Sequence, residues 1–166
     1  MKNNFNKIVW LVVLIIFFYA CKDFDGTREK EFGCKVNGQK WNPFSDDFKF
    51  NPVEAHSYIY SGRRIFYIDG YNSPSNIKIV GFFISDLTTA KDYPLTLSPS
   101  NNVGSIKIGD NEYKTDNVNI GTVSIYKLDT VHQKISGVFS FKAKMVDGNI
   151  TANVTEGYFD VKYKPY

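Results

Sequence analysis

One stretch of eleven residues constrains the fold more than any other part of the sequence. In residues 135–145 (I-S-G-V-F-S-F-K-A-K-M), the odd positions hold apolar residues or glycine, and the even positions are mostly polar. Successive side chains of a β-strand point to opposite faces, whereas the faces of a helix repeat about every 3.6 residues. The alternation therefore predicts a long, half-buried β-strand, whose apolar face needs partners from the rest of the chain.

Much of the chain from residue 32 onward consists of similar short runs separated by turn residues. About ten short strands at near-regular spacing, with no amphipathic helix of useful length, predict a single all-β domain over residues 32–166. The pattern leaves two architectures open, an antiparallel β-sandwich and a small β-barrel. Asn37 and Gly38 predict a tight hairpin near the start of this domain, because both residues accept positive φ.

A second hairpin is predicted in the middle of the chain, with a two-residue turn at Gly62 and Arg63. This register places His56 opposite Asp69, and the simplest pairing of the next strand brings Lys78 beside Asp69, where opposite charges attract. The face expected to join the core carries Ile59, Phe66 and Ile68.

The last strand is expected to contain an irregularity. Ile150, Ala152 and Val154 alternate on even positions, whereas Phe159 and Val161 continue the apolar pattern on odd positions. A β-strand changes parity only by inserting an extra residue. A bulge or break is therefore predicted at Glu156 and Gly157.

Residues 1–20 have the features of a secretory signal peptide. Two lysines precede thirteen continuously apolar residues at 8–20, a run shorter than the roughly 20 residues of a membrane-spanning helix. The run ends in F-Y-A-C, which resembles a bacterial lipobox with Phe18 in place of the preferred leucine. We expect cleavage between Ala20 and Cys21 and lipidation of Cys21, which anchors the protein in a membrane. The alternative is an ordinary signal peptide followed by an unrelated cysteine.

Residues 22–31 (K-D-F-D-G-T-R-E-K-E) contain seven charged residues and cannot bury a core. With Cys21 they form the expected tether, whose ten residues span about 33 Å when fully extended. Lys22, Asp23 and Asp25 also resemble the charged export signal of surface-exposed lipoproteins in Bacteroidota. The expected location is therefore the outer membrane, lipid-anchored at the cell surface. The alternative is an anchored domain that faces the periplasm.

Three segments resemble a family of small, uncharacterised Bacteroidota lipoproteins. Residues 32–43 (F-G-C-K-V-N-G-Q-K-W-N-P) resemble its opening segment, F-x-C-x-V-N-G-x-x-W-x-P. Residues 135–141 (I-S-G-V-F-S-F) and 156–163 (E-G-Y-F-D-V-K-Y) resemble its closing pair of strands, whereas residues 45–112 offer no matching motif. The resemblance implies an all-β lipoprotein with no known activity, so no functional residues are carried over from it.

Charge and composition exclude several classes of function. Without Lys2 and Lys7 of the signal peptide, 18 basic and 17 acidic residues remain, and binding to nucleic acid needs a clustered basic surface. Two cysteines and two histidines are too few and too scattered for a zinc site. With Cys21 acylated, Cys34 remains, and its apolar neighbours favour a small buried side chain over a reactive thiol.

The sequence contains no nucleophile motif, phosphate-binding loop or calcium loop. Two acidic clusters, at 46–47 and 110–112, offer fewer than the six to eight oxygens that Ca²⁺ takes, and turn formation explains both. His56 beside Asp69 lacks a nucleophile on its face. We therefore expect no enzymatic activity, no cofactor and no metal.

Two features remain as candidate sites. Tyrosines suit sugar rings and protein interfaces because they combine a flat apolar ring with a polar tip. Thr130 lies in Asp129-Thr130-Val131, which resembles the Asp-Ser/Thr-aliphatic site of O-glycosylation in Bacteroidota. The candidate ligand face is the polar face of the second hairpin, and it carries His56, Tyr58, Tyr60, Tyr67, Asp69 and Tyr71.

These observations predict a non-enzymatic, lipid-anchored envelope protein whose β domain binds a glycan, a protein or an envelope component. The alternative is a lipocalin-like carrier that holds a small apolar ligand inside a barrel. A third class, a hydrolytic or accessory enzyme of polysaccharide use, is disfavoured because the sequence lacks a catalytic constellation.

Overall fold

The computed structural model describes residues 31–166, which form strands and turns without a helix. The signal peptide, Cys21 and most of the expected tether lie outside the described residues. Within the described part of the chain, no helix is long and apolar enough to cross a membrane. The strands are β1 (Phe32–Val36), β2 (Gln39–Trp41), β3 (Val53–Tyr60), β4 (Arg63–Tyr71), β5 (Ile77–Ile84), β6 (Asp92–Leu95), β7 (Val103–Ile108), β8 (Asn111–Lys114), β9 (Gly121–Asp129), β10 (Lys134–Met145), β11 (Thr151–Lys162) and β12 (Lys164–Pro165).

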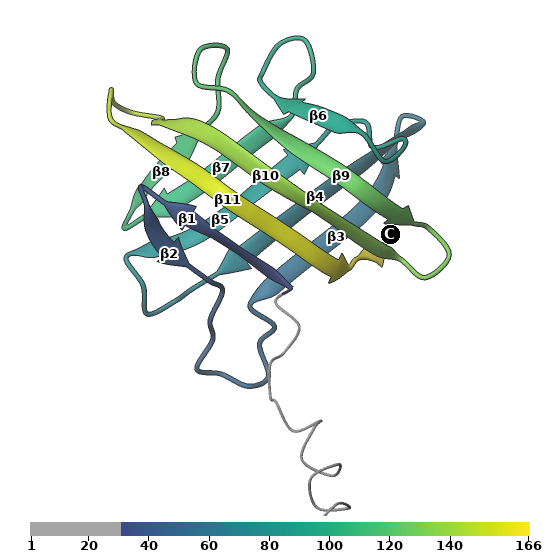
Figure 1. Cartoon of the computed structure of the whole chain (residues 1–166), viewed down its shortest axis with the longest axis horizontal. Helices are drawn as coiled ribbons and strands as arrows, with labels where there is room; N and C mark the ends of the chain where they lie inside the picture. The colour runs from purple at the N-terminus through teal and green to yellow at the C-terminus, as the bar shows by residue number, and fades with distance from the viewer. Residues whose placement is uncertain (1–30) are drawn as a thin grey trace, which may run out of the picture.

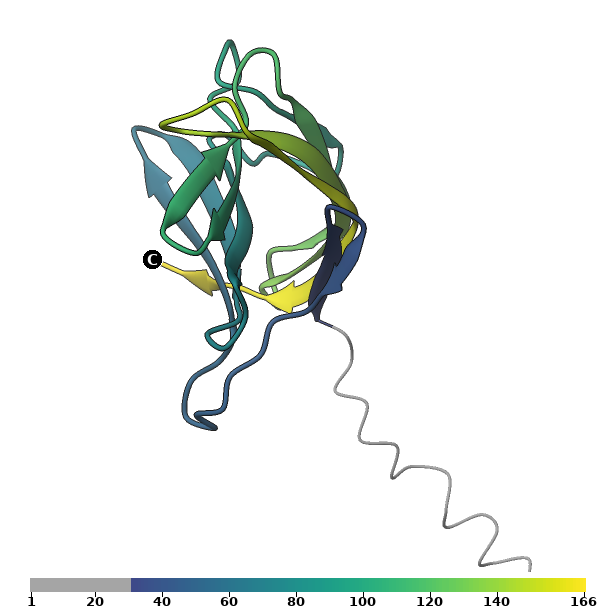
Figure 2. The same ribbon diagram turned by 90° about the vertical axis from the view of Figure 1, so that its left-hand side faces the viewer.

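All of these strands belong to one sheet (Figure 1). The strand order is β12-β3-β4-β5-β7-β8-β10-β11-β1-β2, and β9 pairs with both β10 and β6. The pairs are antiparallel except for β12 with β3. Seen from the side, the sheet curls round on itself into a half-barrel (Figure 2). The all-β prediction is confirmed, and the architecture is one curled open sheet rather than two stacked sheets.

The inside of the curl is filled with aromatic rings. The Phe139 ring of β10 lies 5.2 Å from the Phe32 ring of β1 and 5.4 Å from the Phe82 ring of β5. Phe82 also lies 5.3 Å from Phe159 of β11, and Phe66 lies 5.9 Å from Tyr163. Because these strands come from facing parts of the sheet, the rings join the walls of the half-barrel into one core.

Strand β10 has the alternation that the sequence predicts. Ile135, Phe139 and Ala143 are buried on the inner face, and Val138 on the outer face is exposed. Ser136 is buried although it lies on the outer face, and its hydroxyl is satisfied by the hydrogen bond that it donates to the Asp160 carboxylate of β11.

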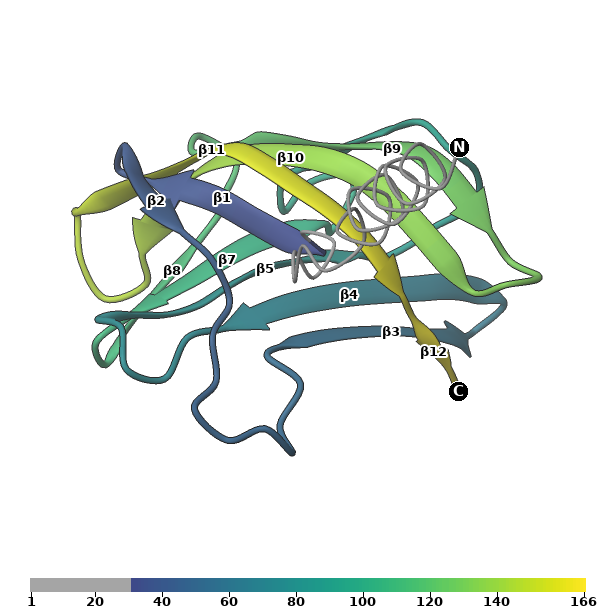
Figure 3. The same ribbon diagram turned by 60° about the horizontal axis from the view of Figure 1, so that its bottom comes forward.

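The two edges of the sheet come together without full pairing, and the resulting seam is bridged at two places (Figure 3). The first bridge follows β2, where the Phe44 amide donates to the Tyr71 carbonyl at 2.8 Å and the Asn72 side chain donates to the Asn42 carbonyl at 2.9 Å. These bonds connect the chain beyond β2 to the end of β4.

The second bridge is made by the C-terminal strand. Lys164 of β12 pairs with His56 of β3, and the Tyr166 amide donates to the Ser57 carbonyl at 2.9 Å. Strand β12 therefore carries the chain from the end of β11 across to the opposite edge of the sheet.

The second predicted hairpin exists, but its turn lies one residue earlier than predicted. Ser61 and Gly62 have φ of 49° and 77°, and both residues of this turn type need positive φ. The pairing consequently shifts by two residues, so that His56 lies opposite Tyr67 rather than Asp69. A shift of two keeps every side chain on its predicted face.

The predicted core face of this hairpin is correct for Phe66 and Ile68, which are fully buried. It is wrong for Ile59, which is 59% exposed. Ile59 pairs with Arg64 next to the turn, where the hairpin extends past the core.

Two local predictions are confirmed. Asn37 and Gly38 form the first hairpin turn with positive φ, and Val36 pairs with Gln39 across it. The pairing of β10 with β11 shifts next to Glu156, whose φ is 52°. This bulge supplies the extra residue for the change of parity that the sequence pattern required.

The aromatic core predicts the cost of shortening its central ring. Phe139→Ala should lower the free energy of unfolding by about 3–5 kcal/mol, because a buried ring is lost and a cavity remains. Urea unfolding of the purified protein measures this change. Val138→Ala, on the exposed face of the same strand, should cost less than about 1 kcal/mol. A similarly small cost for Phe139→Ala would mean that this ring does not hold the two walls together.

Candidate functional site

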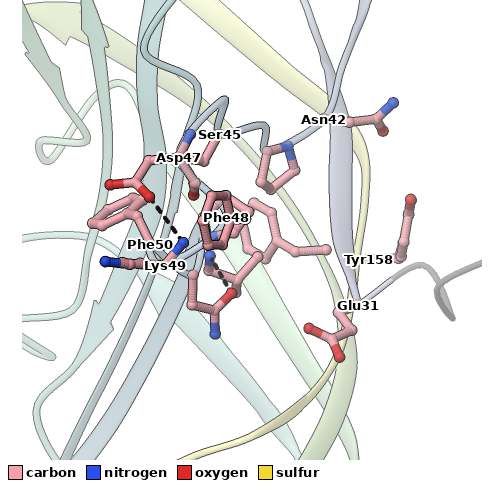
Figure 4. A pocket seen from close by; sticks show the side chains of 13 residues that line it. Glu31, Asn42, Ser45, Asp47, Phe48, Lys49, Phe50 and Tyr158 are labelled. Carbon is pink, nitrogen blue, oxygen red and sulfur yellow. Dashed lines mark hydrogen bonds between the residues drawn. The ribbon is translucent and has the colours of Figure 1, made fainter.

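A groove of about 690 Å³ lies along the open part of the seam (Figure 4). One rim is the connection from β2 to β3, with Asp47, Phe48 and Phe50, and the facing rim includes Glu31 and Tyr158. Three separate segments supply the lining: Glu31 and Phe32; Asn42, Pro43, Ser45, Asp47, Phe48, Lys49, Phe50, Asn51, Pro52 and Val53; and Tyr158.

The loop that forms the first rim is held by its own polar side chains. The Ser45 hydroxyl donates to the Asp47 carbonyl at 2.9 Å, and the Asp47 carboxylate accepts from the Lys49 amide at 2.9 Å. The Asn51 side chain accepts from the Val53 amide at 3.1 Å, where β3 begins. Asp47 thus forms the turn that the sequence predicted for this acidic cluster.

A second hollow of about 310 Å³ continues the groove toward the end of β11. It shares Glu31, Asn51 and Val53 with the larger groove and adds charged side chains from β10 and β11. Among them, the Lys134 ammonium lies 2.9 Å from the Asp160 carboxylate. The seam therefore presents aromatic rings at one end and an ion pair at the other.

The predicted ligand face lies on the outer side of β3 and β4, and part of it is filled by its own rings. The His56 ring lies 5.0 Å from the Tyr67 ring and 5.2 Å from the Tyr166 ring, with both pairs stacked. Tyr166 had no place in the sequence-based prediction, because its contact depends on β12 crossing the seam. His56 is buried, and its Nδ1 has no hydrogen-bond partner among residues 31–166.

The other end of this face is an acidic pair. Glu54 lies directly opposite Asp69, and the Tyr71 hydroxyl donates to the Glu54 carboxylate at 3.4 Å. Burial raises the pKa of the Asp69 carboxyl to about 6, and the negative charge of Glu54 adds to the rise. Tyr60 lies apart from this pair, at the hairpin end, and is 67% exposed.

The predicted pairing of Asp69 with Lys78 is wrong. Asp69 lies opposite Gly81, which has no room for a Cβ atom beneath the carboxylate. Lys78 instead lies 3.7 Å from the Asp110 carboxylate. The register of β4 with β5 differs by three residues from the predicted one, and an odd shift moves each side chain of β5 to the opposite face.

Residues 43–161 match a domain of unknown function (DUF6252). The chain belongs to this family. The match covers the groove loop, the outer face of β3 and β4, and Tyr158, whereas β1, β2 and β12 lie outside it. The chain has no significant match among curated proteins or among solved structures.

The DUF6252 match begins at Pro43, which is the last residue of the opening segment at 32–43. The match therefore does not test the resemblance of this segment to the lipoprotein family. Ala20, Cys21, Lys22, Asp23 and Asp25 lie outside the described residues. Within residues 31–166, no group of three histidine, cysteine or acidic side chains is placed to hold a metal ion.

Two further sequence-based expectations concern single residues. Cys34 is buried, and burial raises the pKa of its thiol to about 12, so it is the small core side chain that was expected. Thr130 is exposed in the turn between β9 and β10. Neighbouring Asp129 accepts from the His132 amide at 2.9 Å and from the Val131 amide at 3.0 Å. The predicted site of modification is therefore an exposed, ordered turn.

The groove itself was missed at the sequence level. Its signal is the segment 44–50 (F-S-D-D-F-K-F), which places three phenylalanines in a stretch that is otherwise polar and ends no predicted strand. The core does not need the phenylalanine rings of this loop, so they remain available for contacts outside the core.

The acidic pair predicts a pH dependence. The folded pKa of Asp69, about 6, lies above its ordinary value of 3.8, so the ionised carboxylate destabilises the fold at neutral pH and this cost disappears as the pH falls. Asp69→Asn should therefore stabilise the protein by about 2 kcal/mol more at pH 8 than at pH 4. Urea unfolding at both pH values measures the difference.

The matched variant is Glu54→Gln. It should move the titration of Asp69, followed by NMR of its carboxyl carbon, to lower pH, because the neighbouring negative charge is removed. An equal effect of Asp69→Asn at pH 4 and pH 8 would contradict the assignment.

Proposed function

We propose that this protein is a lipid-anchored envelope protein of the outer membrane that faces the cell surface and acts as a binding module without enzymatic activity. The signal peptide, the lipobox-like F-Y-A-C and the charged run at 22–31 support the anchor and its orientation. The DUF6252 family carries no described activity, so the proposal rests on the chain's own residues.

The seam groove is the observation that carries the binding role. Ligand sites are typically concave, with apolar or aromatic walls and a few polar groups that fix orientation. Phe50 and Tyr158 supply flat rings, and Asn42 and Glu31 supply hydrogen-bonding groups. This combination suits a short glycan or peptide segment, which presents alternating apolar and polar surfaces.

Two other locations have less support. On the outer face of β3 and β4, the rings of His56, Tyr67 and Tyr166 already stack on one another. A carrier would hold its ligand inside the curled sheet, but this interior is occupied by Phe82, Phe139 and neighbouring rings. The groove therefore remains the better candidate for the ligand site.

The groove assignment predicts a loss of binding on removal of one ring. Tyr158→Ala should weaken binding of a glycan selected from an array screen by about tenfold, since an aromatic contact contributes roughly 1 kcal/mol or more. Isothermal titration with the selected glycan measures the change. Tyr126→Ala, an exposed tyrosine of β9 outside the groove, is the matched control.

The same titration separates the two candidate sites. If Tyr158→Ala binds as the wild type does and the pair Tyr58→Ala with Tyr67→Ala loses binding, the ligand lies on the outer face instead.

The proposed orientation predicts the result of protease shaving. The β domain of the wild type should be cleaved on intact native cells, and the variant Lys22→Ala/Asp23→Ala/Asp25→Ala should be protected, because its charged run no longer directs export. Immunoblots with an antibody to the β domain follow both proteins. Protection of both in intact cells, with cleavage after lysis, would place the domain in the periplasm.

A further inference from the structure

The loop that forms the groove rim carries more exposed apolar surface than the fold requires. Phe48 is 91% exposed, Phe44 is 51% exposed and Phe50 is 40% exposed. Exposed large apolar side chains are unremarkable singly, but a cluster of them marks an interaction surface. Phe50 retains one edge-on contact, at 5.6 Å from the Tyr71 ring.

The position of this loop points to its partner. The connection from β2 to β3 projects from the seam side of the half-barrel, and the described chain begins on that same side (Figures 1 and 2). Glu31 and Phe48 line the same groove. Phe48 and Phe50 therefore lie across this groove from the point where the expected tether joins the domain.

The tether sets the distance to the membrane. Ten residues separate Cys21 from the end of the tether at Glu31, so an anchored domain holds Glu31 within about 33 Å of the acylated cysteine. A tether this short keeps a neighbouring loop at high effective concentration near the bilayer. Of the described surface, the seam side with Glu31 is the part that the tether restrains directly.

The charges of the loop indicate how it would meet the bilayer. Segment 44–50 has Asp46 and Asp47 against Lys49, so attraction to anionic lipid does not favour contact. The apolar rings do, because each buried methylene-sized group contributes about 0.8 kcal/mol. Contact through these rings should therefore occur on zwitterionic lipid as well as on anionic lipid.

We propose that Phe48, with Phe44 on the same loop, inserts into the interface of the bilayer that holds the acylated Cys21, and so docks this side of the half-barrel on the membrane. The proposal rests on the proposed lipid anchor. It gives the domain a second membrane contact beside its acyl chains and fixes the seam side of the molecule as the side that faces the bilayer.

The test places a fluorophore on the loop of the full, acylated protein. Phe48→Cys is labelled with NBD, whose emission shifts to shorter wavelength in an apolar environment, after reconstitution into phosphatidylcholine vesicles. Cys34 does not compete for the label, because its thiol is buried and has a pKa raised to about 12. Acylation occupies the sulfur of Cys21. The control is Val118→Cys, which is 85% exposed in the connection from β8 to β9.

The label at position 48 should show blue-shifted emission that nitroxide-bearing lipids quench, and the label at position 118 should keep the emission of an aqueous site. Aqueous emission at position 48 in the vesicle-bound protein would overturn the proposal. Shielding of position 48 from both nitroxide lipids and aqueous iodide would also overturn it, since a second protein copy would then cover the loop.

Failure of the anchor is read separately, by mass spectrometry of the peptide that contains Cys21. Absence of acyl chains there refutes the anchor and the docking together. Acylated Cys21 with aqueous emission at position 48 refutes only the docking. The groove is tested with Tyr158, which lies outside the loop, so the outcomes for ligand binding and for membrane contact stay distinct.

Discussion

Contact between aromatic rings from facing walls is the interaction on which the half-barrel depends. A sheet of this size has an apolar face that must be covered, and here the sheet covers that face by curling onto itself. Phe139 of β10 meets Phe32 of β1 and Phe82 of β5 at centroid distances of 5.2 Å and 5.4 Å. Large rings fill the width of the curl where smaller side chains would leave voids, so ring size sets how far apart the walls can stand.

This arrangement requires every strand to keep its apolar residues on the inside, which explains the bulge in β11. The strand places Val154 inside before the bulge and Phe159 inside after it, although their spacing is odd. Glu156 absorbs the extra residue with φ of 52°, and Gly157 lies against Phe139, where a Cβ atom would collide with the ring and the carbonyl oxygen. The local irregularity therefore preserves the central aromatic contact.

Features set by neighbouring residues could be predicted from the sequence, and features set by distant contacts could not. The Asn37–Gly38 turn, the alternation of β10 and the parity change at Glu156 are local patterns, and all three are confirmed. The turn at Ser61 was misplaced by one residue, because Gly62 can occupy either position of such a turn. The groove could not be predicted from the sequence, because it lies along the seam. The seam is formed by contacts between distant residues, such as the hydrogen bond from Phe44 to Tyr71.

The seam also explains why the candidate groove and the exposed phenylalanines lie together. The edges of the sheet are bridged after β2 and at β12, and the connection from β2 to β3 must span the open part between them. A loop that served only to connect two strands would need only polar turn residues. Ser45, Asp47 and Asn51 are such residues, and their hydrogen bonds hold this loop in shape. Phe48 adds nothing to that shape and is almost wholly exposed, while the core is already filled by rings from the strands. Its presence is thus better explained by a partner outside the domain than by the fold.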